Sequence, residues 1–169
     1  PGLTLSDSYY RRAAKRIRAT RVKLGFSVSD PAKVKLTESL QADFYKLLSK
    51  DLNDPAVATA LLKTGKPIYV STGLASTTEI SKFLKLAKHF HSPIILNQTQ
   101  LTFDINDANL KAIDTLRRKF KLPVSFGLHS ENLNVLYTAL ALAPQAMLLY
   151  VKGNRRIAHK DERNAVRLA

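Results

Sequence analysis

The chain of 169 residues contains no cysteine, which excludes a disulfide scaffold, a thiolate metal site and a cysteine nucleophile. It has no run of about 18 apolar residues, the length at which a membrane-spanning helix is considered, so we expect no membrane span. Acidic residues are scarce, with 13 Asp and Glu against 27 Lys and Arg. With 45% hydrophobic residues, the composition is that of a globular domain large enough to bury a core, neither disordered nor collagen-like.

The excess of basic residues gives a formal net charge of +14 and a pI near 10.1. Most of this charge lies at the two ends: residues 1–24 hold seven basic residues and one acid, and residues 151–169 hold six basic and two acidic residues. Such a balance predicts an anionic partner: a nucleic acid, an acidic membrane surface or an acidic protein. Because the sequence starts with proline rather than methionine, we expect its natural start to be missing or processed, and no targeting segment is seen.

Apolar runs and amphipathic stretches alternate along the chain. Six apolar or β-branched runs predict strands, at residues 25–29, 44–48, 67–72, 93–97, 123–127 and 146–151. Amphipathic stretches predict helices at residues 6–20, 31–40, 55–63, 77–89, 108–120 and 132–142. We expect Ser76 or Thr77 to cap the fourth helix, with Glu79 in its first turn, and Asp107 to cap the fifth.

This order of helix and strand, repeated six times, predicts parallel strands joined by right-handed crossovers. No glycine-rich phosphate turn follows the first strand, which favours an incomplete (β/α) barrel of the TIM type over an open doubly wound sheet. We therefore expect an α/β fold with about six parallel strands. It would form one domain over residues 1–169, with a basic helix at 6–20, six β/α units at 25–151 and a basic tail at 152–169.

The segment KTGKPIYVSTGLAS, residues 63–76, resembles the sialic acid synthase (NeuB-type) family, in which a glycine-lysine-proline strand ends in Ser-Thr-Gly-Met. Residues 44–49 are similar to the family's Lys-Ile-x-Ser strand, and residues 108–113 and 139–142 to two of its helices. The resemblance implies a (β/α)8 barrel of which strands three to eight are present, without the first two strands and the C-terminal antifreeze-like domain. It also implies condensation of phosphoenolpyruvate with an N-acetylated sugar, using a divalent metal held by two histidines.

The resemblance implies phosphate-binding roles for three side chains. Lys46 matches the family's phosphate-binding lysine, Ser71 matches the serine of its Ser-Thr-Gly motif, and Ser29 stands where the family has a threonine. From the residues alone, a lysine at a strand end is explained equally well by exposure to solvent, and a serine there by turn chemistry. Asp161 aligns loosely with a family aspartate beyond the last strand.

The metal site is where the sequence departs most from the family. His129 stands where Ser-Asp-His-Thr supplies the first metal histidine, whereas an alignment on Gly127 places Glu131 there. Tyr150 occupies the position of the second histidine, and Leu148 that of the acid, in Glu-Lys-His-Phe. The family's His-Cys-Thr-x-x-Tyr-Pro loop is replaced by NQTQLTF. Since one imidazole alone is a weak metal site, we expect no catalytic residue, no cofactor and no metal; His129 would be a ligand only in an active, metal-dependent enzyme.

The basic ends predict a surface for a polyanion. In the first helix, Tyr10, Ala13, Ala14 and Ile17 form one apolar face, and basic residues cover the rest. No acid occurs from residue 8 to residue 29, so like charges repel one another unless an anion offsets them. No RNA-binding motif with stacking aromatics is present, and contacts would go to the phosphate backbone. The residues expected to bind nucleic acid are Arg11, Arg12, Lys15, Arg16, Arg18, Arg21, Lys152, Arg155, Arg156, Lys160 and Arg163.

Three functions stay open at this point. The main interpretation is a catalytically degenerate synthase-like barrel that serves as a basic structural subunit of a larger assembly, such as the ribonucleoprotein of an organellar ribosome. The alternatives are an N-acetylneuraminate synthase-type enzyme, whole or as a fragment, and a non-catalytic binder of phosphate or a phosphosugar through Lys46 and Ser71. Expected partners are RNA or another polyanion, and protein subunits that cover the open strand edges. We expect an intracellular protein, with the mitochondrion or another organelle left open.

Overall fold

The computed structural model describes residues 5–99, 101–102, 104–153 and 161–167. These residues form one seven-stranded sheet in which strand order equals chain order and every neighbouring pair is parallel. The strands are β1 (Gly25–Ser27), β2 (Phe44–Leu47), β3 (Ile68–Ser71), β4 (Ile94–Thr99), β5 (Val124–Leu128), β6 (Met147–Lys152) and β7 (Ala165–Arg167). Sequential parallel strands of this kind are the arrangement of a (β/α) barrel.

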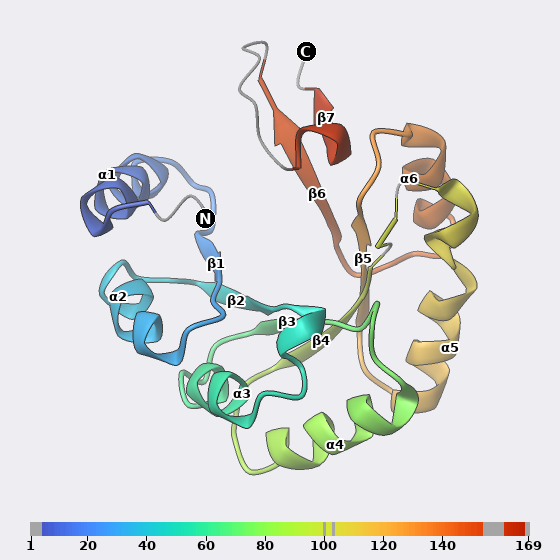
Figure 1. Cartoon of the computed structure of the whole chain (residues 1–169), viewed down its shortest axis with the longest axis horizontal. Coiled ribbons are helices and arrows are strands. Elements are labelled where there is room, and N and C mark those ends of the chain that lie inside the picture. The colour runs from blue at the N-terminus through green and yellow to red at the C-terminus, as the bar shows by residue number, and fades with distance from the viewer. Residues whose placement is uncertain (1–4, 100, 103, 154–160, 168–169) are drawn as a thin grey trace.

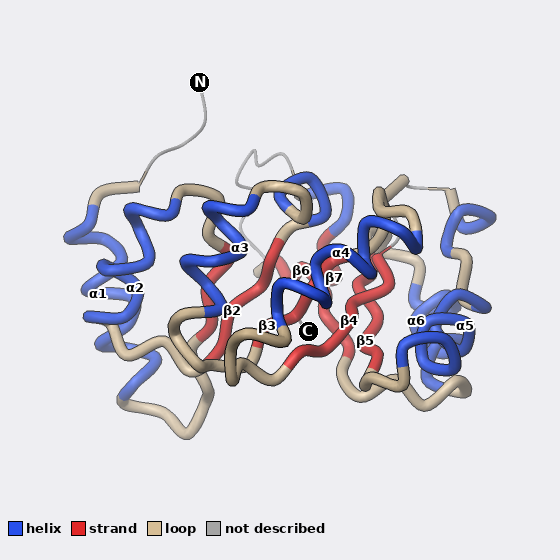
Figure 2. Tube along the Cα trace, turned by 90° about the horizontal axis from the view of Figure 1, so that it is seen from below, coloured by secondary structure: helices blue, strands red, loops and turns tan. Residues whose placement is uncertain are grey.

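The helices lie on the convex side of the curved sheet (Figures 1 and 2). The α-helices are α1 (Asp7–Arg18), α2 (Val34–Ser39), α3 (Pro55–Leu62), α4 (Thr77–Ala87), α5 (Lys111–Phe120) and α6 (Leu133–Leu140), and the short 3-10 helices are η1 (Pro31–Lys33), η2 (Ser49–Asp51), η3 (Ile105–Ala108) and η4 (Glu162–Asn164). Within the described residues the sheet does not close between β1 and β7 (Figure 1). The structure is therefore an open half-barrel of the TIM type, which confirms the predicted α/β class.

Local sequence signals explain where most helices begin. Ser76 caps α4 in a reciprocal capping box with Glu79, as predicted. The predicted cap of the fifth helix is wrong, because Asp104, not Asp107, caps a separate 3-10 turn, η3. Asn109 then adopts a left-handed conformation with φ of 43°, which interrupts the helical path, and α5 begins only at Lys111.

The main core lies between the convex face of the sheet and the helices. Tyr45, Leu47, Val70, Leu96 and Phe126 supply buried side chains at alternate strand positions. Because successive strand residues point to opposite faces, the residues between them line the concave side. We call this concave side the lumen.

The N-terminal helix packs as its apolar face predicts. Ala14 is buried, and Tyr10 and Ile17 pack with it against a second small cluster that contains Leu24 and Leu40. No helix of the described residues is both long enough and apolar enough to cross a membrane.

The predicted basic tail contains secondary structure that the sequence patterns did not reveal. Strand β7 extends the sheet beyond β6, with Tyr150 opposite Ala165 and Lys152 opposite Arg167. It has only three residues, too few to show an alternating pattern. Three of the tail's predicted nucleic-acid contacts, Arg155, Arg156 and Lys160, lie outside the described residues.

Candidate functional site in the lumen

A buried polar row crosses the lumen on the three central strands. Pairing places Ser71 of β3 beside Asn97 of β4, and Asn97 beside Ser125 of β5. The Asn97 amide donates to Thr99 Oγ1 over 2.7 Å, and its oxygen accepts from Ser125 Oγ over 2.8 Å. Asn97 and Ser125 are fully buried, and their polar atoms are satisfied by one another. Gly127 allows this packing, since a Cβ there would lie 2.9 Å from the Asn97 amide nitrogen.

Lys46 lies in a neighbouring row of the lumen. The register sets it opposite Ser27 of β1 and Tyr69 of β3. Below it, the Phe44 ring packs edge-on against Tyr69 and covers Gly25, where a Cβ would collide with the ring. Phe44 lies two residues nearer the N-terminal end of β2 than Lys46, whereas the sites of such barrels form at the C-terminal ends of the strands.

Burial lowers the pKa of the Lys46 ammonium below the ordinary lysine value, while the negative charge of Asp161 acts in the opposite direction. Asp161 also acts on Tyr150, whose pKa is raised first by burial and then by that carboxylate. The segment after β6 therefore places Asp161 within electrostatic reach of both β2 and β6. The loose sequence match of Asp161 to a family aspartate corresponds to a position at the mouth of the lumen.

The three predicted phosphate-binding residues are not equally placed. Lys46 and Ser71 lie on the same face of adjacent strands, with Ser71 two positions beyond the residue paired with Lys46. Ser29 lies beyond the end of β1, where its hydroxyl donates to Asp51 Oδ2 over 2.6 Å and lies 3.2 Å from Lys50 Nζ. The structure thus places Lys46 and Ser71 on one face of adjacent strands, whereas the Ser29 hydroxyl contacts Lys50 and Asp51 of η2.

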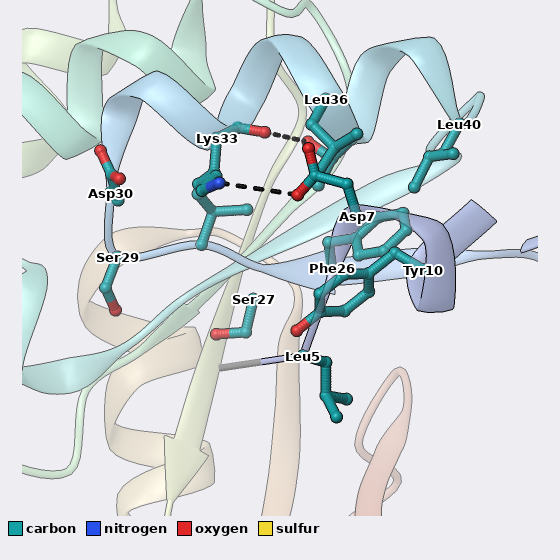
Figure 3. Close-up of a pocket in the computed structure, with 12 residues that line it drawn as sticks. Leu5, Asp7, Tyr10, Phe26, Ser27, Ser29, Asp30, Lys33, Leu36 and Leu40 are labelled. Carbon is teal, nitrogen blue, oxygen red and sulfur yellow. Dashed lines mark hydrogen bonds and ion pairs between the residues drawn. The ribbon is translucent and has the colours of Figure 1, made fainter. Parts of the chain in front are cut away.

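A cavity of about 450 Å³ opens beside β1, between α1 and α2 (Figure 3). Ser27 and Ser29 line it, but most of its lining is apolar, with the rings of Tyr10 and Phe26 in an edge-to-face arrangement. The one ion pair drawn there joins Lys33 Nζ to Asp7 over 3.6 Å. Such a lining does not favour a phosphate, so the lumen rather than this cavity is the candidate anion site.

The two residues at the family's metal-histidine positions stack on each other. The rings of His129 and Tyr150 lie 5.3 Å apart at an angle of 26°. On the neighbouring positions, Lys152 Nζ lies 3.3 Å from Glu131 Oε2 and donates to the Glu162 carbonyl over 2.8 Å. The described residues contain no group of three His, Asp or Glu that could hold a metal ion. In either alignment, the residues present do not fit the divalent ion that the family resemblance implies.

The basic residues of α1 face outward. Arg11, Arg12, Lys15 and Arg16 are exposed, and none of them pairs with an acid of the described chain. Arg18 differs, because its guanidinium lies 3.1 Å from Asp43 Oδ2 and ties the helix to the start of β2. Arg21 and Arg163, also in the predicted set, are exposed, whereas Lys152 is paired with Glu131.

A family model described as NeuB family matches residues 2–163. The chain belongs to the NeuB family. It is 29% identical over 122 residues to the pseudaminic acid synthase of Campylobacter jejuni, covering 70% of this chain and 36% of that protein. It is 21% identical over 148 residues to the human N-acetylneuraminate-9-phosphate synthase, covering 86% of this chain and 41% of that protein.

Solved structures agree in fold. The N-acetylneuraminic acid synthetase from Leptospira borgpetersenii, crystallised with citrate, superposes with a TM-score of 0.90 at 21% identity, over 96% of this chain and 58% of that chain. At that identity the likeness concerns the fold alone. This NeuB-family chain spans about a third to two fifths of the length of the curated relatives it matches.

Sequence reasoning missed the central polar row and the Lys152 contacts. A signal for the row was present in the alternation Val-Ser-Phe at 124–126, which marks a strand with a polar lumen face, whereas Leu-Asn-Gln-Thr at 96–99 does not alternate. No comparable signal existed for Lys152, because its partners Glu131 and Glu162 lie in two separate segments, the loop after β5 and η4.

Proposed function

We propose that the lumen binds phosphoenolpyruvate, as the anion-binding part of a NeuB-type synthase barrel. The observation that carries this proposal is the half-buried Lys46, whose ammonium shares the lumen face with Ser71 on the adjacent strand. A cation partly removed from water attracts a phosphate or carboxylate more strongly than one in bulk solvent. Family membership supports the same role for this lysine and serine.

The lumen offers donors suited to a small anion. Lys46 supplies a positive charge, and Ser71 supplies a hydroxyl that is buried at the edge of the polar row. Asn97 holds Ser125 and Thr99 through its own hydrogen bonds, so its role is to position the row. The negative charge of Asp161 acts against the desolvation that lowers the pKa of the Lys46 ammonium. These side chains would bind or orient the anion in the lumen.

Thermal unfolding with phosphoenolpyruvate tests the proposal directly. A ligand at about 100 times its dissociation constant stabilises a protein by about 2.7 kcal/mol, which corresponds to a rise in Tm of about 5–10 °C for a chain of this size. Lys46→Met should abolish this rise, and Ser71→Ala should reduce it. Lys85→Met, on the exposed side of α4, is the matched control and should keep it. An unchanged Tm in the parent protein would contradict the proposal.

Catalysis is a separate step of the same proposal. The relatives are named pseudaminic acid synthase and N-acetylneuraminate-9-phosphate synthase. The family resemblance implies an N-acetylated sugar as the second substrate, and N-acetylmannosamine is the one to test. Condensation that Lys46→Met abolishes would establish a synthase. Binding of phosphoenolpyruvate without condensation would establish a non-catalytic binder, which is the narrower form of the proposal.

A second candidate function is docking onto RNA, as a structural subunit of a ribonucleoprotein such as an organellar ribosome. It is favoured by the exposed cations of α1, which have no acidic partner within the described residues. Joint replacement of Arg11, Arg12 and Arg16 by glutamate should weaken binding to an arbitrary RNA and flatten its dependence on salt. Binding that is already weak and insensitive to salt in the parent protein would remove this candidate.

The sheet ends supply a further expected contact. Strands β1 and β7 each have one neighbour within the described residues, and unpaired strand edges favour association. We propose that other subunits, or further parts of the same protein, cover these edges. Size-exclusion chromatography with light scattering should then show a species larger than 18.8 kDa for this chain, and a clean monomer would contradict the proposal.

A further inference from the structure

Lys152 lies at the mouth of the lumen, where the family resemblance implies a divalent ion. It follows Tyr150 by two positions on β6, so both residues share the lumen face. Its ammonium contacts Glu131 after β5 and the main-chain oxygen of Glu162 in η4, at 3.3 and 2.8 Å. The Lys152 side chain is only 22% exposed, so the lysine is held between these segments rather than extended into solvent.

We propose that the Lys152 ammonium is a built-in cation that takes the place of the divalent ion at the lumen mouth. It joins three segments, β6, the loop after β5 and η4, that a bound ion would otherwise connect. It also offsets the charge of Glu131, the acid that stands at a metal-histidine position when the sequences are aligned on Gly127. Leu148 has no donor atom to offer an ion, and the Tyr150 ring is stacked on His129.

The position of Lys152 has a consequence deeper in the lumen. By holding the Glu162 carbonyl, it fixes the residue before it, Asp161, whose carboxylate acts on both Lys46 and Tyr150. Lys152 is therefore a positioning residue for the charges of the mouth. This inference concerns organisation of the mouth and holds whether or not phosphoenolpyruvate binds.

The first test compares stability and metal binding. With Mn²⁺ as the probe, the parent protein should show the same Tm in EDTA and in added Mn²⁺, and titration calorimetry should show no saturable binding at micromolar concentrations. Lys152→Met should lower Tm by about 2–4 °C, as expected for loss of roughly 1 kcal/mol, and Lys152→Arg should largely restore it. The control Lys85→Met should leave Tm unchanged, because it removes an exposed lysine of α4.

The second test makes the ammonium and the metal compete. The double substitution Leu148→Glu with Tyr150→His returns the family's acid and histidine to the mouth. Mn²⁺ should bind this protein at least about tenfold more tightly when Lys152→Met is added, because the ammonium repels the ion and occupies Glu131. Circular dichroism checks that each variant is folded. Adding Lys152→Arg to the Leu148→Glu, Tyr150→His protein should leave its Mn²⁺ affinity as weak as with Lys152.

Two results would overturn the inference. One is micromolar Mn²⁺ binding by the parent protein that raises its Tm. The other is an Mn²⁺ affinity of the Leu148→Glu, Tyr150→His protein that does not change when Lys152→Met is added. Both readouts are independent of the phosphoenolpyruvate test, so this inference and the proposed function can fail separately.

Discussion

Replacement of Asn97 by alanine tests whether the polar row holds the lumen together. The change removes two short hydrogen bonds, from the Asn97 amide to Thr99 and from Ser125 to the Asn97 oxygen. Each is worth about 0.5–1.5 kcal/mol. Asn97 is fully buried, so the vacated volume adds about 1 kcal/mol more. We expect the free energy of unfolding to fall by about 2–4 kcal/mol.

Urea unfolding followed by circular dichroism measures this loss, and a double-mutant cycle locates it. Ser125→Ala alone should cost about 1 kcal/mol, because its hydroxyl loses the Asn97 oxygen. In the double variant the two losses should overlap by about 1 kcal/mol, since both remove the same bond. Ser81→Ala on the outside of α4 is the control and should stay within about 0.5 kcal/mol of the parent. The row would not be a structural unit if Asn97→Ala matched that control, or if the two losses simply added.

Three further changes probe the scaffold around the site. Gly127→Ala should lower the unfolding midpoint in urea, at a cost of about 1–3 kcal/mol, because its Cβ would lie 2.9 Å from the Asn97 amide; an unchanged midpoint would show that the row can shift. The Leu24 N–H, followed by Arg18, lowers the pKa of Asp43, so its stabilisation is present above about pH 4 and is lost as pH falls further. Asp43→Asn should therefore be less stable than the parent at pH 7 and approach it in acid; a constant difference in Tm across pH would contradict this. Burial, followed by the Glu38 hydrogen bond, raises the pKa of Tyr45, so the parent should lose stability as pH rises above about 10, and Tyr45→Phe should remove that part of the decline in Tm.

The sequence predicted the order of elements because local signals determine it. Alternating apolar runs marked the strands, and prolines and capping residues marked boundaries that lie within a few residues of those observed. The predicted element boundaries were wrong where a local signal was weak or misleading. Asn109 has no obvious mark of its left-handed conformation, so the start of α5 was placed too early. Strand β7 is too short for periodicity, so the tail was described only by its charge.

The candidate site was predicted in part: sequence motifs indicated individual residues, but not the contacts that these residues make. Lys46 and Ser71 were singled out by the resemblance to the NeuB-type family, and the strand register places them on one face of adjacent strands. Ser29 was grouped with them, and in the structure its hydroxyl donates to Asp51. The sequence showed that the metal ligands are replaced, whereas it gave no sign that Lys152 approaches Glu131.

By itself, the sequence determined the α/β alternation, the parallel sheet and the apolar face of α1. These follow from residue types and short-range spacing, which act within a few residues of the chain. Only the tertiary structure decided that Asn97 hydrogen-bonds to Ser125, that the charge of Asp161 acts on Lys46 and that Lys152 contacts Glu131 and Glu162. Those contacts join residues from 10 to more than 100 positions apart in the chain. They depend on strand register and on the curvature of the sheet, which no local pattern records.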